Sequence, residues 1–212
     1  MADRKHGIQA PPTDSEITHE VWDREDLSGR AFTRVAFRDV DLTEVTATGA
    51  TFDECTFRDV DFNAASFTDT AFLNCTFTRS SFFGARFTGC KLTGSMFDRC
   101  RFGALTVQGG NWAFVGLPGA DLRKTVWRDV GLREADLTGA RLSGALLNHV
   151  DLGGAWLQKA DLAEADLRGS DLSTLDPLTV SMGRAVIDLD QTVVIAEALG
   201  LVVSPYPAVR DA

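Results

Sequence analysis

Large apolar residues recur at every fifth position over most of this chain. From Trp22 to Leu172, 31 successive positions of this register are apolar, and all are Phe, Leu or Trp except Ala47 and Val107. A second register, two residues earlier, carries mostly small side chains such as Cys55. Neither an α-helix, with a period of about 3.6, nor an ordinary β-strand, with a period of two, produces this spacing.

The repeating unit reads small–x–large–x–turn, which describes short straight segments bent at corners. Four such segments close a square coil of 20 residues, and parallel coils stack about 4.8 Å apart. The 14 Phe against a single Tyr fit this arrangement, because a hydroxyl on the axis would have no partner. The pattern predicts an all-β protein: a right-handed quadrilateral parallel β-helix over residues 21–176.

The two ends break the pattern. Residues 1–20 are polar, contain two adjacent prolines and are predicted to form a mobile N-terminal tail. Residues 177–212 are predicted to form a C-terminal cap and dimerisation segment with a short helix. Asp188 or Asp190 suits its N-cap, and Gly200 suits its end. The helix would carry one apolar stripe and be followed by a short strand; the stripe is Leu189, Val193, Ala196 and Leu199, and the strand is residues 201–203.

Residues 105–119, in the middle of the repeat, fit the two registers least well and predict a local bulge.

Composition argues against several classes of protein. No apolar run approaches the ~20 residues of a membrane span, and the first twenty residues lack the apolar region of a secretory signal. We therefore expect a cytoplasmic protein with no membrane contact and four free thiols. A net charge of −9 disfavours direct binding of nucleic acid, because phosphate contacts need Lys and Arg.

Residues suited to catalysis are scarce. The three histidines are His6 and His19, in the predicted tail, and His149, at an outward corner. No nucleophile pair or phosphate-binding glycine motif is present. Cys55 and Cys75, 20 residues apart, are expected to be stacked structural thiols. We predict that the protein is not an enzyme and has no catalytic residue, cofactor or metal.

Acidic residues concentrate toward the C-terminus. The net charge is −4 over residues 1–26, +1 over 27–159 and −6 over 160–200. The candidate acidic surface consists of Asp161, Glu164, Asp166, Asp171, Asp176, Asp188 and Asp190. One interpretation is an ordinary solvated surface, since Asp before the large residue suits the backbone of the repeat. The other is an electrostatic field like that of duplex DNA.

Two stretches, Ala135–Gly139 (ADLTG) and Ala165–Gly169 (ADLRG), resemble the repeat of the pentapeptide-repeat family. The segments 94–107, 119–123, 175–177, 186–194 and 198–201 resemble the fluoroquinolone-resistance group of that family, the MfpA and Qnr proteins. The resemblance implies a right-handed quadrilateral β-helix, a C-terminal homodimer and binding to DNA gyrase as a mimic of duplex DNA. The unbroken register leaves no insertion loop of the Qnr kind.

These observations together favour a DNA mimic that binds DNA gyrase, with topoisomerase IV as a second target, inhibits supercoiling and protects against fluoroquinolones. Two alternatives stay open: a self-immunity factor against a natural gyrase poison, and a generic protein-binding scaffold rod. The expected dimer interface consists of Val180, Met182, Val186, Ile187, Val193, Val194, Leu201 and Val202. Three outward aromatic residues, Phe83, Phe114 and Trp156, are either surface contacts or rings lying flat over a neighbouring strand.

Overall fold

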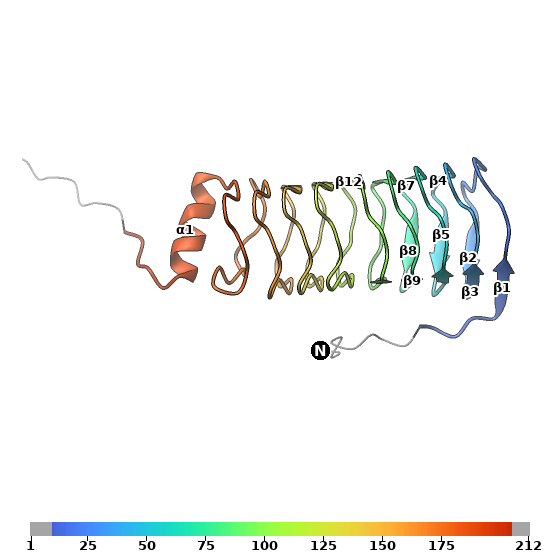
Figure 1. Cartoon of the computed structure of the whole chain (residues 1–212), viewed down its shortest axis with the longest axis horizontal. Coiled ribbons are helices and arrows are strands. Elements are labelled where there is room, and N and C mark those ends of the chain that lie inside the picture. Colours follow the sequence, from blue (N-terminus) through green and yellow to red (C-terminus); the bar gives the residue numbers. More distant parts are fainter. Residues whose placement is uncertain (1–9, 205–212) are drawn as a thin grey trace, which may run out of the picture.

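The computed structural model describes residues 10–204, which form a rod of stacked coils with one helix at its C-terminal end (Figure 1). Within the coils, a residue lies beside the residue 20 positions further along the chain, as Phe37 lies beside Phe57 and Phe52 beside Phe72. All strand pairs are parallel within the part of the chain that the structure describes. The predicted quadrilateral parallel β-helix with a helical cap is therefore confirmed.

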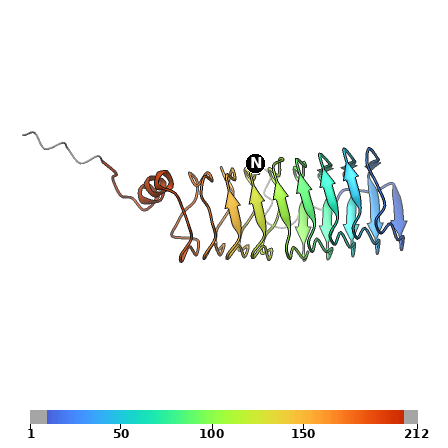
Figure 2. The same ribbon diagram turned by 90° about the horizontal axis from the view of Figure 1, so that it is seen from above.

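The four sides of each coil stack into four faces, here called A to D in chain order (Figure 2). Face A holds β1 (Ser15–Thr18), β3 (Val35–Arg38), β6 (Thr56–Arg58), β9 (Thr76–Thr78) and β11 (Met96–Asp98). Face B pairs only through isolated bridges such as Asp41–Asp61. Face C holds β4 (Thr46–Thr48), β7 (Ser66–Thr68), β10 (Arg86–Thr88), β12 (Thr106–Gln108), β13 (Val126–Arg128) and β14 (Leu146–Asn148). Face D holds β2 (Ala31–Thr33), β5 (Thr51–Asp53) and β8 (Ala71–Leu73).

The apolar registers fill the interior of the rod. Phe rings stack along each face: the ring centroids of Phe52 and Phe72 lie 4.6 Å apart with an interplanar angle of 4°. Rings on adjacent faces meet edge to face, as Phe67 and Phe72 do at 5.2 Å. Offset and edge-to-face contacts are the favourable aromatic geometries. The core is therefore one continuous column, and each coil contributes to it in the same way.

Each side of a coil is either a short strand or a tight turn. The residue before the large apolar residue is a strong local signal for which of the two forms. Thr at this position begins a strand, as at Thr46, Thr56 and Thr76, in keeping with the β-propensity of Thr. Asp at this position precedes a tight turn. Asp136 Oδ1 accepts the N–H of Thr138 at 3.0 Å, a contact that favours a local turn over an extended strand.

The regular coils extend beyond both predicted boundaries. Residues 15–18, which were expected to belong to the mobile tail, form β1 and pair with β3, and Ile17 continues the apolar register. At the other end Met182 and Ile187 also continue it, and Val186 pairs with Asp166. These end sides keep the shape of the coil with a single apolar residue each, because their backbone N–H and C=O groups pair with the neighbouring coil. Residues 1–9 of the predicted tail lie outside the described residues.

The bulge expected in residues 105–119 is absent. β12 pairs with β10 and β13 without an extra residue. Gly110 explains how this stretch keeps the register: its φ is +91°, and a Cβ there would lie 2.1 Å from the carbonyl oxygen of Cys90. A glycine therefore lets two coils approach where a side chain would push them apart.

The helix α1 (Leu189–Ala198) closes the C-terminal end of the rod. Asp188 is its N-cap, in a capping box with Gln191, and Gly200 follows it at φ +81°. The buried Gln191 amide donates hydrogen bonds to the carbonyl oxygens of Leu167 and Ser170, both at 2.7 Å. The cap therefore satisfies backbone acceptors at the end of the last coils. The strand expected at residues 201–203 is absent, since this segment pairs with no neighbouring strand.

Candidate functional site

The C-terminal acidic residues form a ring around the rod. Asp161, Asp166, Asp171 and Asp176 are five residues apart, so one lies on each of the faces B, C, D and A. The remaining members are placed as follows: Glu164 at the corner after face B, Asp188 at the helix N-cap and Asp190 in the first turn of the helix. A spacing of five distributes charge around the axis, whereas a spacing of 20 would align it in one row.

Each Asp of this ring also stabilises a turn. Asp161 and Asp166 accept backbone N–H groups two residues ahead at 3.1 and 3.2 Å. Asp171 and Asp176 do the same, both at 2.9 Å. The carboxylates are thus part of the backbone structure of the repeat as well as candidates for binding.

Hydrogen bonds keep several of these carboxylates ionised. The guanidinium of Arg168 lowers the pKa of Asp166, and the hydroxyl of Ser173 lowers the pKa of Asp171. The backbone N–H groups of Gln191 and Gly169 lower the pKa of Asp188. Because a lowered pKa favours the charged form, these groups carry full negative charge at neutral pH.

The coils divide the surface charge into three segments. Residues 14–73 (the N-acidic segment) hold 14 acids and 5 bases, a net charge of −9. Residues 74–133 (the basic belt) hold 3 acids and 9 bases, a net charge of +6. Residues 134–204 (the C-acidic segment) hold 11 acids and 4 bases, a net charge of −7. The window 27–159, which is nearly neutral as a whole, conceals this basic belt between two acidic segments.

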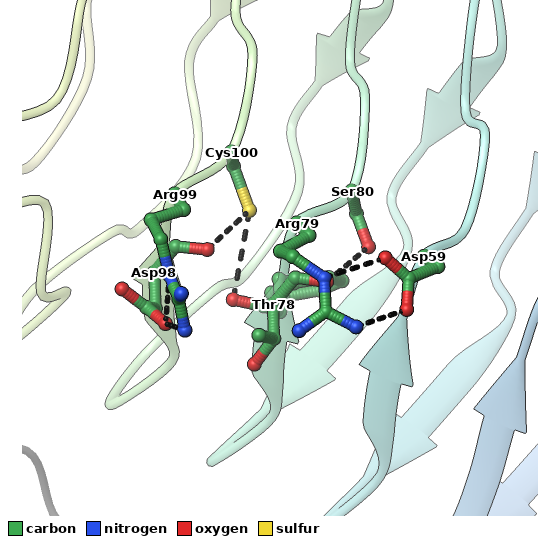
Figure 3. A network of polar contacts seen from close by, with 8 residues as sticks. Asp59, Thr78, Arg79, Ser80, Asp98, Arg99 and Cys100 are labelled. Carbon is green, nitrogen blue, oxygen red and sulfur yellow. Dashed lines mark hydrogen bonds and ion pairs between the residues drawn. The ribbon is translucent and has the colours of Figure 1, made fainter.

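The corner between faces A and B shows the change from one segment to the next (Figure 3). Arg79, in the basic belt, donates from Nε to Asp59 of the preceding coil at 2.8 Å. One coil later, Arg99 turns to its neighbour Asp98, at 2.9 Å. The carboxylates of the N-acidic segment therefore end here, and the guanidinium groups of the belt begin.

The four cysteines are free thiols, as expected, and all lie in the inward register. Cys75 Sγ lies 3.3 Å from the carbonyl oxygen of Phe52. Burial raises the pKa of Cys90 to about 11 and that of Cys100 to about 12, and it raises that of Cys75 as well. These thiols are protonated at neutral pH, which disfavours nucleophilic chemistry.

The end of the rod beyond the last coil is apolar and exposed. The predicted interface residues separate into two groups. Val180, Met182, Ile187 and Val194 are partly buried against the core. The exposed group consists of Val186 (45 %), Val193 (41 %), Leu201 (60 %) and Val202 (92 %). Most of the predicted helical stripe is also exposed, including Leu189 at 87 %, because the buried side of the helix carries Gln191.

The three outward aromatic residues lie at separate places. Phe83 is on face B, 62 % exposed, with its ring over Gly103; a Cβ at Gly103 would lie 2.9 Å from that ring. Phe114 is at a corner with φ +60° and is 37 % exposed. Trp156 is on face A and half-buried. The three residues do not form a common patch, and Phe83 is the most exposed of them.

Within residues 10–204, no group of three or more His, Cys, Asp or Glu residues is placed to hold a metal ion. His149 lies outward at a corner, 3.8 Å from Asp129. No helix in the same part of the chain is long and apolar enough to cross a membrane.

Comparison with known proteins supports the repeat. The family described as Pentapeptide repeats matches in eight copies, over residues 26–59, 61–99, 117–148 and 145–174. No curated protein matches the chain. Among solved structures, a trypsin-treated variant of QnrB1, a plasmid-mediated fluoroquinolone resistance protein, aligns with a TM-score of 0.54 and 20 % identity, covering 91 % of this chain and 99 % of its own.

Other solved structures give similar values. Full-length QnrB1 aligns with a TM-score of 0.51 and 19 % identity, covering 87 % of this chain and 100 % of its own. HetL, involved in heterocyst differentiation regulation in Nostoc sp. strain PCC 7120, aligns with a TM-score of 0.50 and 20 % identity, covering 82 % and 86 %. At these identities the similarity establishes the fold, and proteins of different roles share it.

Proposed function

The chain belongs to the pentapeptide-repeat family, and on this basis we propose that it binds DNA gyrase as a mimic of duplex DNA. Topoisomerase IV is a second target of the same kind. Binding inhibits supercoiling and protects the enzyme from fluoroquinolones. The proposal agrees with the structural similarity to QnrB1, a fluoroquinolone resistance protein.

The observation that carries the proposal is the C-acidic segment. A net charge of −7 surrounds the rod there, and the carboxylates occupy fixed positions because they also hold backbone turns. A preorganised anionic rod attracts a basic groove built for DNA and speeds association with it. The basic belt limits the mimicry to the acidic segments, since the belt would be repelled by such a groove.

A homodimer through the C-terminal end completes this proposal. The exposed residues Val186, Val193, Leu201 and Val202 lie at the end of the rod, where a two-fold contact would cover them. Such a contact joins two C-acidic segments, so a net charge of −14 lies across the middle of a rod twice as long. In this proposal the apolar end forms the dimer, and the dimer joins the two acidic surfaces into one longer anionic surface.

A supercoiling assay tests the proposal directly. Purified protein is titrated into DNA gyrase with relaxed plasmid, with and without a fluoroquinolone. We expect loss of supercoiling at high protein concentration and fewer drug-induced DNA breaks at lower concentration. If supercoiling is unaffected and neither gyrase subunit binds the protein, the proposal is wrong and a scaffold for another protein becomes the better explanation.

Charged substitutions test the dimer separately. Val186→Glu should give a monomer in light scattering, because an apolar interface cannot cheaply desolvate an unpaired charge. Val194→Glu should do the same, but Val194 also packs against the core, so its thermal unfolding is measured alongside. Val186 is 45 % exposed in the single chain, so its substitution leaves the coil intact. A wild-type chain that is monomeric at micromolar concentration would contradict the dimer.

A further inference from the structure

Face B carries a groove within and beside the basic belt. Its larger part has a volume of about 810 Å³ and is lined by residues including Arg101, Phe102, Arg123 and Lys124. A smaller part of about 460 Å³ adjoins it and includes Arg141; the two parts share Phe102. We call the two parts together the face-B groove. Its lining includes the short residues Gly103 and Gly144, at positions that Phe83 and Lys124 occupy one coil earlier.

The cations of this groove outnumber the carboxylates at its centre. Asp121 accepts hydrogen bonds from two guanidinium groups: that of Arg123, at 2.7 Å, and that of Arg141. Arg101 lies 3.8 Å from Asp61, beyond hydrogen-bond distance, and its side chain is 75 % exposed. Among the described residues no ion pair includes Lys124. Asp98, which also lines the groove, is paired with Arg99. Five cations thus line the groove against Asp98 and Asp121 at its centre and Asp161 and Glu164 at its C-terminal end, and Arg101 and Lys124 keep donors available for further anionic oxygens.

An aromatic surface adjoins the N-terminal end of the groove. The ring of Phe83 lies next to Gly103 and is 62 % exposed, and it lines a hollow together with Arg101. An exposed ring beside a guanidinium offers an apolar contact next to a charged one. This combination fits a ligand that has both anionic and apolar groups.

We propose that the face-B groove binds a short acidic peptide segment of a partner protein, with an apolar residue placed on Phe83. The charge of the groove is complementary to such a segment. Arg101 and Arg141 are two coils apart, roughly 10 Å, which corresponds to about three residues of extended peptide. The inference can be tested apart from gyrase binding, since Arg101, Lys124 and Phe83 lie in the basic belt, although the C-terminal end of the groove reaches Asp161 and Glu164 of the C-acidic segment.

The ends of the groove favour a short peptide over a nucleic acid strand. Asp61 lies beyond Arg101 at one end, and Asp161 and Glu164 line the other. A strand longer than the groove would bring its phosphates against these carboxylates, and like charges in proximity are unfavourable. A segment of three or four residues stays within the cationic part.

Fluorescence anisotropy at low salt tests the inference. The probe is a labelled peptide of sequence Phe-Glu-Asp-Glu-Asp, compared with the neutral peptide Phe-Gln-Asn-Gln-Asn and with a labelled oligothymidine strand. We expect the acidic peptide to bind, the neutral peptide to bind about tenfold more weakly, and the affinity to fall as salt is raised.

Two double variants locate the site. Arg101→Glu with Lys124→Glu should weaken peptide binding by about tenfold or more. Both changes are compatible with the fold, because Asp161 and Glu164 occupy the same positions in a later coil. The control, Arg86→Glu with Lys91→Glu, changes the charge of the belt equally, but these exposed residues lie on faces C and D. It should alter affinity by about twofold at most.

Three outcomes would overturn the inference. The first is no binding of the acidic peptide by the wild-type protein. The second is an equal loss in both double variants, which would assign binding to the overall charge of the belt. The third is tighter binding of the oligothymidine strand than of the peptide, which would make the groove a nucleic-acid site.

Discussion

The two halves of the rod build the same coil from different residues. In residues 32–102 the large register is mostly Phe, and most sides are strands, from β2 to β11. In residues 117–172 it is Leu with one Trp, and β13 and β14 are the strands of that half. We call these the Phe half and the Leu half. The residue before each large apolar residue differs too: Thr is frequent there in the Phe half and Asp in the Leu half.

This comparison shows how the repeat produces the charge of the C-acidic segment. Sides built on Thr hold their shape through strand pairing, whereas sides built on Asp hold it through a carboxylate that accepts a backbone N–H. A half that uses Asp for its turns acquires negative charge as a consequence. A binding role for that charge is therefore additional to a structural one, and experiments must separate the two.

The largest expected effect on stability is in the stack of Phe rings along face D. Phe72→Ala should lower the free energy of unfolding by ~3–5 kcal/mol, through lost burial and a cavity. Phe72 is 1 % exposed and stacks on Phe52. Phe72→Tyr should also destabilise, because its hydroxyl would have no partner on the axis. Guanidinium unfolding measures both, with Leu142→Ala as the matched change in the Leu half. Unchanged midpoints for both Phe72 variants would refute the column assignment.

The next effect concerns the Asp turns of the Leu half. Asp136→Ala should cost ~1–3 kcal/mol, since it leaves the N–H of Thr138 without its acceptor. Asp136→Asn keeps an acceptor oxygen and should cost much less. Asp98→Ala, in a strand of the Phe half, is the control and should be nearly neutral in thermal unfolding. An equal loss for the Ala and Asn variants at Asp136 would show that charge, and not the turn contact, stabilises this side.

Acid should lower the stability of the fold by protonating carboxylates of the C-acidic segment. The folded state lowers the pKa of Asp166, Asp171 and Asp188, so their contribution is present above the pKa of an unfolded Asp, about 3.9. It is lost as the pH falls from there through the folded pKa. Melting temperatures between pH 7 and 3 should fall less for Asp171→Asn than for the wild type. Parallel curves would show that Asp171 does not contribute to this loss.

The smallest expected effect separates binding from structure. Asp166→Asn with Asp171→Asn keeps oxygen acceptors for the turns and removes two charges from the C-acidic segment. If the proposed gyrase complex forms, its association rate at low salt should fall several-fold, and the difference should shrink as salt rises. The control Asp98→Asn, within the basic belt, should change the association rate less. An equal change in the control and in the double variant would place the contact surface outside the C-acidic segment.

The sequence was sufficient to predict the fold because the register is local and unbroken. Phe52 and Phe72 had to stack once the coil closed at 20 residues, and the structure places them so. The ends were harder to predict. Ile17, Met182 and Ile187 continue the register, but their neighbours are polar or irregular, and only pairing with an adjacent coil shows that they belong to it.

The candidate site was predicted less completely. The acidic residues were identified, but their arrangement as a ring depends on which face each one occupies. The basic belt was missed because opposite charges cancel when residues 27–159 are counted as one window. Counting charge in units of one coil would have revealed it. The groove on face B could not be anticipated, since its lining residues come from several coils.

The coil of 20 residues also determines which insertions and deletions the gene can accept. Adding one whole coil lengthens the rod by about 4.8 Å and leaves every downstream residue on its face. Adding five residues keeps the apolar register but turns everything downstream by one face, so Arg123 and Lys124 would leave the side that carries Phe83. Adding one residue places polar side chains inside. Families of such rods can therefore diverge in length by whole coils while keeping their surfaces aligned, and single pentapeptide changes rearrange those surfaces at once.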